Sequence, residues 1–231
     1  MVSWDTVFKP KQKGGLGIPS LSALNFAFNC SVIYRMYNCP SPLSSWLTAH
    51  YVSPWLPHSP KASKFWISVC KTAAIVKSNF KLVITPNAPI SLHWDHWCNN
   101  STLVDFVGGV PLDCFSYPLL KNYLSNLNWV FTDDTPMNLK TAVSSFHIHD
   151  TSSYCLFWKD CAKAKFRNFL EDLFSHLPDC SWNKLVWRKN NILKHSFYVW
   201  LCSSGGVENP GCFKAKNNSC PGDLLSLLLG T

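Results

Sequence analysis

The chain has 231 residues, of which 47% are hydrophobic and only 15% are charged. This composition is enough for a buried core and excludes a wholly disordered protein, and no apolar run approaches the roughly 20 residues of a membrane span. The formal net charge of +8 is concentrated, because residues 1–94 hold nine basic side chains against the single acid Asp5, whereas residues 95–231 hold twelve of each. Such a one-sign field favours a polyanion, most commonly nucleic acid, and the alternative is a solvated basic face.

The cysteines do not indicate a disulfide framework. There are eleven of them, an odd number, at irregular spacings and without a Cys-x-x-Cys pair. The opening "MVSWDTVFKPK" is polar and lacks the apolar segment of a secretory leader. We therefore expect reduced, buried thiols in an intracellular protein, in the cytoplasm or the nucleus.

The first half of the chain predicts two helices. Residues 1–20 are irregular, and Ser20 or Ser22 caps a helix to about Tyr37 whose apolar residues nearly encircle the axis, which favours burial. Prolines 40, 42, 54, 57 and 60 then break the chain into short pieces. Residues 62–77 predict a second helix, with Lys64 and Lys71 off its apolar face. Residues 79–98 indicate loop and strand, and "KLVIT" (81–85) is the clearest strand.

The second half predicts further helices and then a tail. Residues 159–177 carry the most regular amphipathic stripe, and shorter helices are expected in "SWNKLVWR" (181–188) and "KHSFYVWLC" (194–202). The last 29 residues, from Ser203, are rich in glycine and proline and predict a loosely ordered C-terminal tail. The fold class expected is mainly α with short β elements (α+β), joined by irregular, proline-rich connections.

The opening stretch "VSWDTVFKPKQKGGLGI", followed by "SLSALNFAFNCSVIYRMY", resembles plant LINE-type (non-LTR) retrotransposon reverse transcriptases, in the region just after the polymerase domain. Phe8 stands where the family usually has cysteine. The matching residues are Trp4, Val7, Pro10, Lys11, Gly14, Gly15, Leu16, Gly17, Ile18, Asn25, Tyr34 and Arg35.

Two later stretches match the same family in the same order. "ISLHWDHWCNN" (90–100) keeps Trp94, Asp95 and Trp97 of a family element. "WNKLVWRKNNILKHSFYVWL" (182–201) resembles the start of the family's zinc-binding region, through Trp182, Leu185, Val186, Trp187, Ile192, His195, Ser196, Phe197, Trp200 and Leu201. The resemblance implies a post-polymerase connection region over 1–150, the helical start of the zinc-binding region over 151–202, and a divergent or truncated tail over 203–231.

The glycines of the opening stretch do not form a phosphate-binding loop. A Walker-type loop needs Gly-x-x-x-x-Gly-Lys-Ser/Thr, and a dinucleotide-binding turn needs a preceding strand. Gly14, Gly15 and Gly17 are better interpreted as permissive backbone in a tight turn that leads into the first helix.

The sequence predicts no polymerase chemistry for this chain. Polymerases hold magnesium with carboxylates from two motifs, and the resemblance implies that these motifs lie upstream of the opening stretch. "FTDD" (131–134) imitates a polymerase hairpin, but no companion motif accompanies it, and Asp133 and Asp134 are better interpreted as a surface turn. We therefore expect no catalytic residue and no magnesium cofactor here.

The resemblance implies zinc for the intact family, but this chain departs from the ligand pattern. Only Cys202, Cys212 and Cys220 follow the last match, no histidine follows His195, and "LSLL" stands where a Cys-x-x-Cys pair is expected. We therefore expect no family-type zinc site and no other cofactor. His93 and His96 flank Asp95, and His147 and His149 alternate, but a polar turn and a lone pair are the simpler interpretations.

The function predicted is that of a non-catalytic fragment of a retrotransposon reverse transcriptase protein that retains weak, sequence-independent RNA or DNA binding. The residues expected to bind are Lys9, Lys11, Lys13, Lys61, Lys64, Lys71, Lys77 and Lys81, with Trp66 as a stacking platform. The alternatives are a helical protein–protein interaction module over 159–201, or a decayed element with no selected function. No membrane partner is expected, and the oligomeric state stays open.

Overall fold

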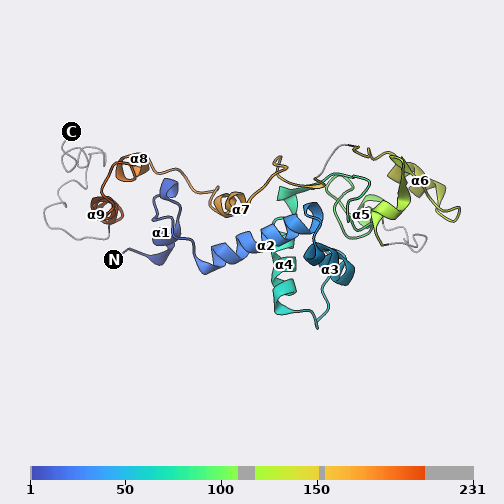
Figure 1. Cartoon of the computed structure of the whole chain (residues 1–231), viewed down its shortest axis with the longest axis horizontal. Helices are drawn as coiled ribbons and strands as arrows, with labels where there is room; N and C mark the ends of the chain where they lie inside the picture. Colours follow the sequence, from blue (N-terminus) through green and yellow to red (C-terminus); the bar gives the residue numbers. More distant parts are fainter. Residues whose placement is uncertain (1, 109–117, 151–153, 206–231) are drawn as a thin grey trace. The chain divides into compact units, whose positions relative to one another are not determined.

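The computed structural model describes residues 2–108, 118–150 and 154–205. Over these residues the protein is mainly helical with two small antiparallel sheets of two strands each, which confirms the predicted fold class (Figure 1). The tail predicted from Ser203 lies outside the described residues beyond Gly205. None of the described helices is long and apolar enough to cross a membrane.

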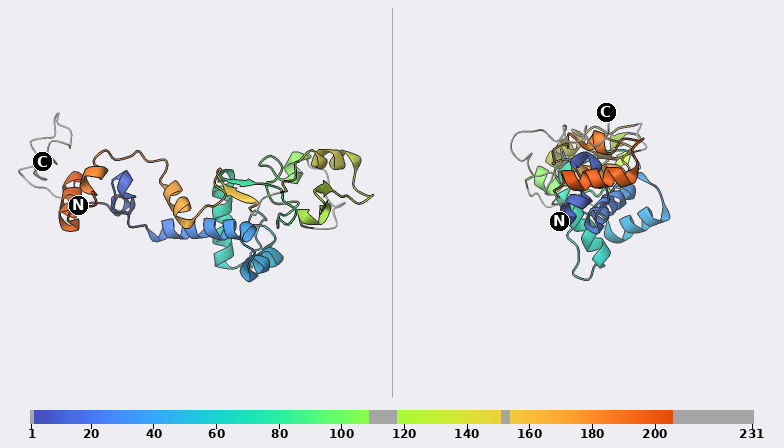
Figure 2. Two further views of the ribbon diagram at one scale, coloured as in Figure 1. Left: turned by 45° about the horizontal axis from the view of Figure 1, so that its top comes forward. Right: turned by 90° about the vertical axis from the view of Figure 1, so that its left-hand side faces the viewer.

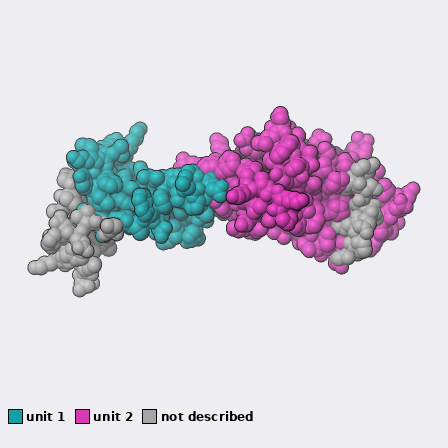
Figure 3. Space-filling model, turned by 90° about the horizontal axis from the view of Figure 1, so that it is seen from below, with its two compact units in different colours: residues 1–25, 170–231 teal, residues 26–169 magenta. Residues whose placement is uncertain are grey.

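The chain forms two compact units. Unit 1 comprises residues 1–25 and 170–231, and unit 2 comprises residues 26–169 (Figure 3). The regions implied by the family resemblance divide the chain after residues 150 and 202, whereas the compact units divide it elsewhere. Both ends of the chain therefore belong to one unit.

Three helices lie wholly or largely in unit 2, and serine caps set where they begin. Helix α2 (Leu21–Asn38) starts after Ser20, whose Oγ accepts from the N–H of Ala23 at 3.1 Å. Helix α3 (Pro42–Tyr51) begins with a capping box of Ser41 and Ser44, and α4 (Lys64–Ile75) begins at the N-cap Ser63. The predicted helices over 20–37 and 62–77 are thus confirmed, and α3 lies within the segment that was predicted to be broken by prolines.

Helix α4 crosses α2 at a steep angle (Figures 1 and 2), and the two helices are in contact. Ala27 and Ile33 of α2 and Val69 and Ala73 of α4 are fully buried. Asn29 Nδ2 bridges the pair by donating to Ser68 Oγ and Thr72 Oγ1. The prediction that α2 is buried all round is wrong, because side chains such as Leu21 and Phe28 remain exposed to solvent.

Two short antiparallel sheets complete unit 2. Strand β1 (Phe80–Leu82) pairs with β4 (Leu156–Trp158) in the register Phe80 to Trp158, so the predicted strand starts one residue earlier than expected. Strands β2 (Leu124–Ser125) and β3 (Asn128–Trp129) form a hairpin. The remaining elements are η2 (Lys77–Asn79), α5 (Leu103–Phe106), η3 (Leu120–Tyr123) and α6 (Met137–Ser144).

The helix predicted over 159–177 is much shorter in the structure. Helix α7 spans Phe166–Leu173, because β4 is followed by a tight turn in which Trp158 and Cys161 exchange backbone hydrogen bonds. Lys159 adopts a positive φ of 54°, which a helix does not allow. Asn168 Oδ1 then accepts from the N–H of Lys165 at the start of α7.

Unit 1 joins segments from the two ends of the sequence. It contains α1 (Trp4–Phe8), η1 (Lys11–Lys13), α8 (Asn183–Val186) and α9 (Leu193–Ser203), so both short helices predicted near the C-terminus are confirmed. Its core contains Val186 and Trp200, and the half-buried side chains packed on them come from both ends of the chain: Val2, Val7, Leu16, Trp182, Leu185, Trp187, Val199 and Leu201.

Candidate nucleic-acid interface

The first and last family-like stretches meet in unit 1. Trp200 Nε1 donates to the carbonyl oxygen of Gly14 at 2.9 Å, and the N–H of Cys180 donates to Gln12 O at 2.7 Å. Phe197 stacks on Trp200 with ring centroids 5.8 Å apart. The glycine-rich turn is therefore a packing partner of α9.

The glycines of this turn have the structural role predicted for them. Gly14 and Gly17 have φ values of 84° and 74°, in the left-handed region that costs an L residue strain. At Gly15, an added Cβ would lie 2.0 Å from the carbonyl oxygen of Lys9. The prediction of a tight turn is confirmed.

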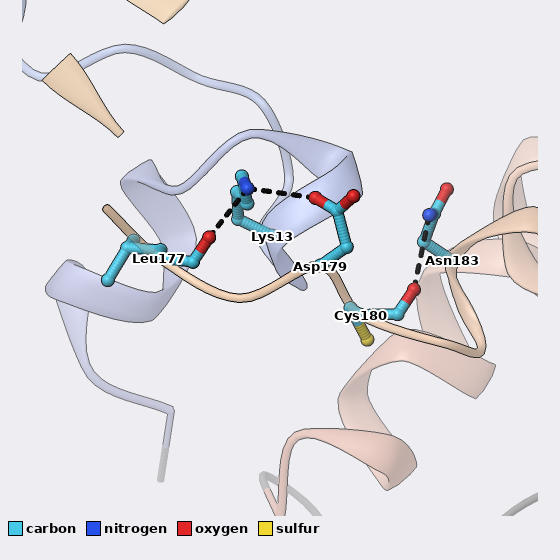
Figure 4. A network of polar contacts seen from close by, with 5 residues as sticks. All are labelled: Lys13, Leu177, Asp179, Cys180 and Asn183. Atoms are coloured by element: carbon cyan, nitrogen blue, oxygen red, sulfur yellow. Dashed lines mark hydrogen bonds and ion pairs between the residues drawn. The ribbon is translucent and has the colours of Figure 1, made fainter. Parts of the chain in front are cut away.

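Of the lysines predicted to bind nucleic acid, two in unit 1 make contacts within the protein. Lys13 Nζ donates to Leu177 O at 2.6 Å and pairs with Asp179 at 2.8 Å (Figure 4). Lys11 Nζ lies 4.3 Å from the ring centroid of Trp187, which is a cation–π contact. Lys9 is half-buried. These contacts hold the turn on the C-terminal segment and reduce the charge available to a ligand.

The other five predicted lysines belong to unit 2. Lys61, Lys64, Lys71 and Lys81 are exposed, and Lys77 is half-buried. Within the part of the chain that the structure describes, none of the five forms an ion pair with a carboxylate. The positive charges of these five lysines are therefore not neutralised by a described carboxylate and are available to an anionic partner.

The prediction that Trp66 is a stacking platform is wrong. Trp66 is 2% exposed and lies in the core beneath Tyr51, with their rings stacked at a centroid distance of 4.1 Å. A nucleotide base cannot reach it, because α3 covers the face of α4 that carries it.

The structure instead shows an exposed aromatic stack on α3, which was not predicted from the sequence. Trp46 is 54% exposed and stacks on His50, one helical turn later, with centroids 5.1 Å apart and ring planes at 8°. Tyr51 meets both rings edge-on and joins the pair to Trp66. The capping box at Ser41 could have revealed the helix and this i, i+4 spacing, but not the exposure of its aromatic face.

Asp95, from the second family-like stretch, is a fully buried hydrogen-bond acceptor in unit 2. Its Oδ1 accepts from Tyr37 Oη at 2.8 Å and from Ser53 Oγ, and its Oδ2 accepts from the N–H of Ser91 at 2.7 Å. Burial raises the pKa of Asp95 to about 7, although the three hydrogen bonds oppose the shift. Asp95 therefore connects α2, the end of α3 and the loop after β1.

The residues on either side of Asp95 are partly or fully buried in unit 2. Trp97 is buried and donates from Nε1 to Leu92 O at 3.0 Å, whereas Trp94 is partly exposed. Burial, followed by the charge of Lys77, lowers the pKa of His96 to about 4. The interpretation of residues 93–96 as a polar turn among tryptophans agrees with this arrangement.

Several other predicted residues lie at the surface. Trp4 is exposed and stacks on Phe8, and His195 is exposed on α9. Asp133 and Asp134 lie in an exposed turn, as predicted. Among the described residues, no group of three histidine, cysteine or acidic side chains could hold a metal ion. Cys202 is exposed, and Cys212 and Cys220 lie outside the described residues.

A cavity of about 630 Å³ lies in unit 2 beside α3. Its lining includes Thr48, Ala49 and Val52 of the α3 segment, Cys155, and Lys121 as a charged group. Trp46 and His50 do not line it, so the aromatic stack and the cavity use different sides of α3.

Comparisons with protein-family models, curated proteins and solved structures find no match to this chain.

Proposed function

We propose that this protein is a non-catalytic fragment of a LINE-type reverse transcriptase protein that binds RNA or DNA without sequence preference. The observation that carries the proposal is the basic group of unit 2. Lys61, Lys64, Lys71 and Lys81 are exposed and free of ion pairs with the carboxylates that the structure describes. No acidic residue occurs in the sequence between Asp5 and Asp95, so no carboxylate of this segment opposes a phosphate backbone.

The family origin is supported by the roles of the matching residues. Gly14 and Trp200, from opposite ends of the chain, are joined by a hydrogen bond. Asp95, from the middle stretch, is the buried acceptor of three hydrogen bonds. Residues with such structural roles are the ones that a fragment would retain after the catalytic part is separated from it.

The proposal is tested by measuring binding of the full chain to labelled RNA and DNA at several salt concentrations. Phosphate contacts release counterions, so we expect affinity to fall by at least about tenfold between about 50 and 200 mM salt. Different sequences should bind alike. Absence of binding to both RNA and DNA at low salt would refute the proposal.

A second candidate function is protein–protein interaction through α9. Leu193 and Phe197 lie one helical turn apart and are both exposed, as is Ile192 just before the helix. An apolar contact of this kind hardly weakens with salt. Self-association or partner binding that persists at high salt, and is lost in a Leu193→Glu variant, would favour this function.

A further inference from the structure

The start of α4, which two lysines flank, contacts the end of α3, the helix that carries the aromatic stack. The hydroxyl groups of Tyr51, at the end of α3, and Ser63, the N-cap of α4, are 3.4 Å apart. Lys61 and Lys64 flank Ser63 in the sequence, and both are exposed. The segment that carries these two lysines thus contacts Tyr51, whose ring meets those of Trp46 and His50 edge-on.

The end of α3, next to the aromatic stack, is fixed by contacts with the core of unit 2. Tyr51 lies on the buried Trp66, and its ring meets His50 edge-on at a centroid distance of 4.5 Å. Val52 follows with φ 63° and ψ −60°, and the N–H of Ser53 donates to Tyr51 O at 2.7 Å, which is a strained γ-turn for a β-branched residue. Ser53 Oγ in turn donates to Asp95. A platform fixed in this way loses little entropy when a ligand stacks on it.

We infer that this surface, Trp46 and His50 with Lys61 and Lys64, binds single-stranded nucleic acid in preference to duplex. An exposed indole that is already parallel to an imidazole can extend the stack with a base, and the two ammonium groups match the adjoining phosphates. In a duplex the base faces are covered by their neighbours, so only the phosphate contacts remain. This inference rests on the proposed function and adds to it the strandedness of the ligand.

The lysines near the exposed aromatic side chains favour nucleic acid over an apolar partner. Phe65 follows Lys64 on α4, is exposed, and contacts the exposed Phe28 at a centroid distance of 6.3 Å. Lys64 therefore adjoins an exposed aromatic side chain in the sequence, and no acidic residue lies in this part of the sequence. Aromatic rings with basic side chains between them suit successive bases and phosphates of one strand.

The test measures binding of the full chain to fluorescently labelled nucleic acid by fluorescence anisotropy. The probes are single strands of about 12 nucleotides, as RNA and as DNA, and the matching duplex. We expect the single strands to bind several-fold more tightly than the duplex. Trp46→Ala should weaken single-strand binding by about tenfold and leave duplex binding unchanged, because one stacking contact is lost. Trp46→Phe should restore part of the affinity. Unequal affinity for RNA and DNA would identify the preferred strand, whereas equal affinity would show that the shared base and phosphate chemistry is recognised.

Trp94→Ala, a change at another partly exposed tryptophan of unit 2, is the matched control and should leave both affinities unchanged. Lys61→Gln with Lys64→Gln should weaken single-strand and duplex binding alike and lower the salt dependence. Equal affinity for single strand and duplex, or single-strand binding that Trp46→Ala does not change, would overturn the inference while leaving the proposed function intact. Absence of binding to all three probes would refute both.

Discussion

Asp95 is a buried carboxylate whose hydrogen-bond donors differ in what they can do. The hydroxyl groups of Tyr37 and Ser53 donate to Oδ1, and each could instead accept after rotation. The N–H of Ser91, which donates to Oδ2, cannot change its role. A protonated Asp95 therefore satisfies the site with its proton on Oδ1, which agrees with the raised pKa of about 7.

The first prediction concerns this proton. The folded-state pKa of Asp95 is raised above the ordinary value of 3.8, so the folded protein keeps a proton that the unfolded chain releases between about pH 4 and 7. The contribution of Asp95 to stability is therefore fully present below about pH 4 and is lost as pH rises through 7. Asp95→Asn imitates the neutral acid and should remove this pH dependence. Between about pH 4 and 7, the free energy of unfolding of the wild type should therefore fall by about 2–4 kcal/mol relative to that of the variant.

The measurement is the free energy of unfolding by denaturant at several pH values. His96 contributes with the opposite sign below its ordinary pKa of 6.5, since burial lowers its pKa to about 4. Both proteins contain His96, so the difference between them isolates Asp95. Asp134→Asn, at an exposed position, should keep the wild-type pH dependence. Identical profiles for the wild type and Asp95→Asn would contradict the role assigned to Asp95.

A second residue-level prediction separates two glycines of the same turn. Gly15→Ala places a Cβ against the carbonyl of Lys9, which is backbone and cannot move aside easily. Gly17→Ala places its Cβ 3.4 Å from a flexible lysine side chain and carries mainly the strain of its positive φ. We expect Gly17→Ala to lower the free energy of unfolding by about 1–2 kcal/mol and Gly15→Ala by more. Thermal unfolding measures both, and equal losses would argue against the close approach at Gly15.

At the level of elements, α9 depends on a segment that is distant in sequence. Trp200 is 1% exposed, and its indole N–H is satisfied by the carbonyl of Gly14. The order of apolar residues along α9 does not by itself explain why Trp200 is inside while Tyr198 is exposed. The turn around Gly14 covers one face of the helix and so decides which side chains are buried.

The third prediction follows from this contact. Trp200→Ala removes a large buried side chain and leaves the Gly14 carbonyl without its donor, so unit 1 should lose about 3–5 kcal/mol of stability. Hydrogen exchange should then accelerate both in α9 and in the turn around residues 9–17. Tyr198→Ala, on the exposed side of the same helix, should change neither segment. Faster exchange in α9 alone would mean that the turn is held by other contacts.

At the level of the whole molecule, the position of the positive charge matters more than its total. Residues 1–94 account for the whole net charge of +8, because the later residues carry as many basic as acidic side chains. In unit 1, Lys13 is neutralised by Asp179, whereas the exposed lysines of unit 2 form no ion pair with a described carboxylate. The binding potential of the early sequence is therefore concentrated in α4 and its flanks.

The fourth prediction compares two sets of substitutions that lower the net charge equally. Changing Lys61, Lys64, Lys71 and Lys81 to Gln should weaken RNA binding by about tenfold or more and flatten its salt dependence. The matched set changes four exposed lysines of the later sequence, Lys121, Lys184, Lys189 and Lys194, and should have a much smaller effect. Equal weakening by both sets would mean that total charge, rather than this surface, determines binding.

What the sequence determined by itself is local. A serine cap placed α2, the spacing of apolar residues placed α4, the glycine spacing indicated a tight turn, and the charge counts located the basic segment. Each of these signals acts within a few residues or is a sum over them. The tertiary structure decided which faces are covered. It buried Trp66 under Tyr51 and left Trp46 exposed, ended α7 early through the turn after β4, and joined Gly14 to Trp200. Burial depends on elements that are distant in the chain, and no pattern within one helix specifies what packs against it.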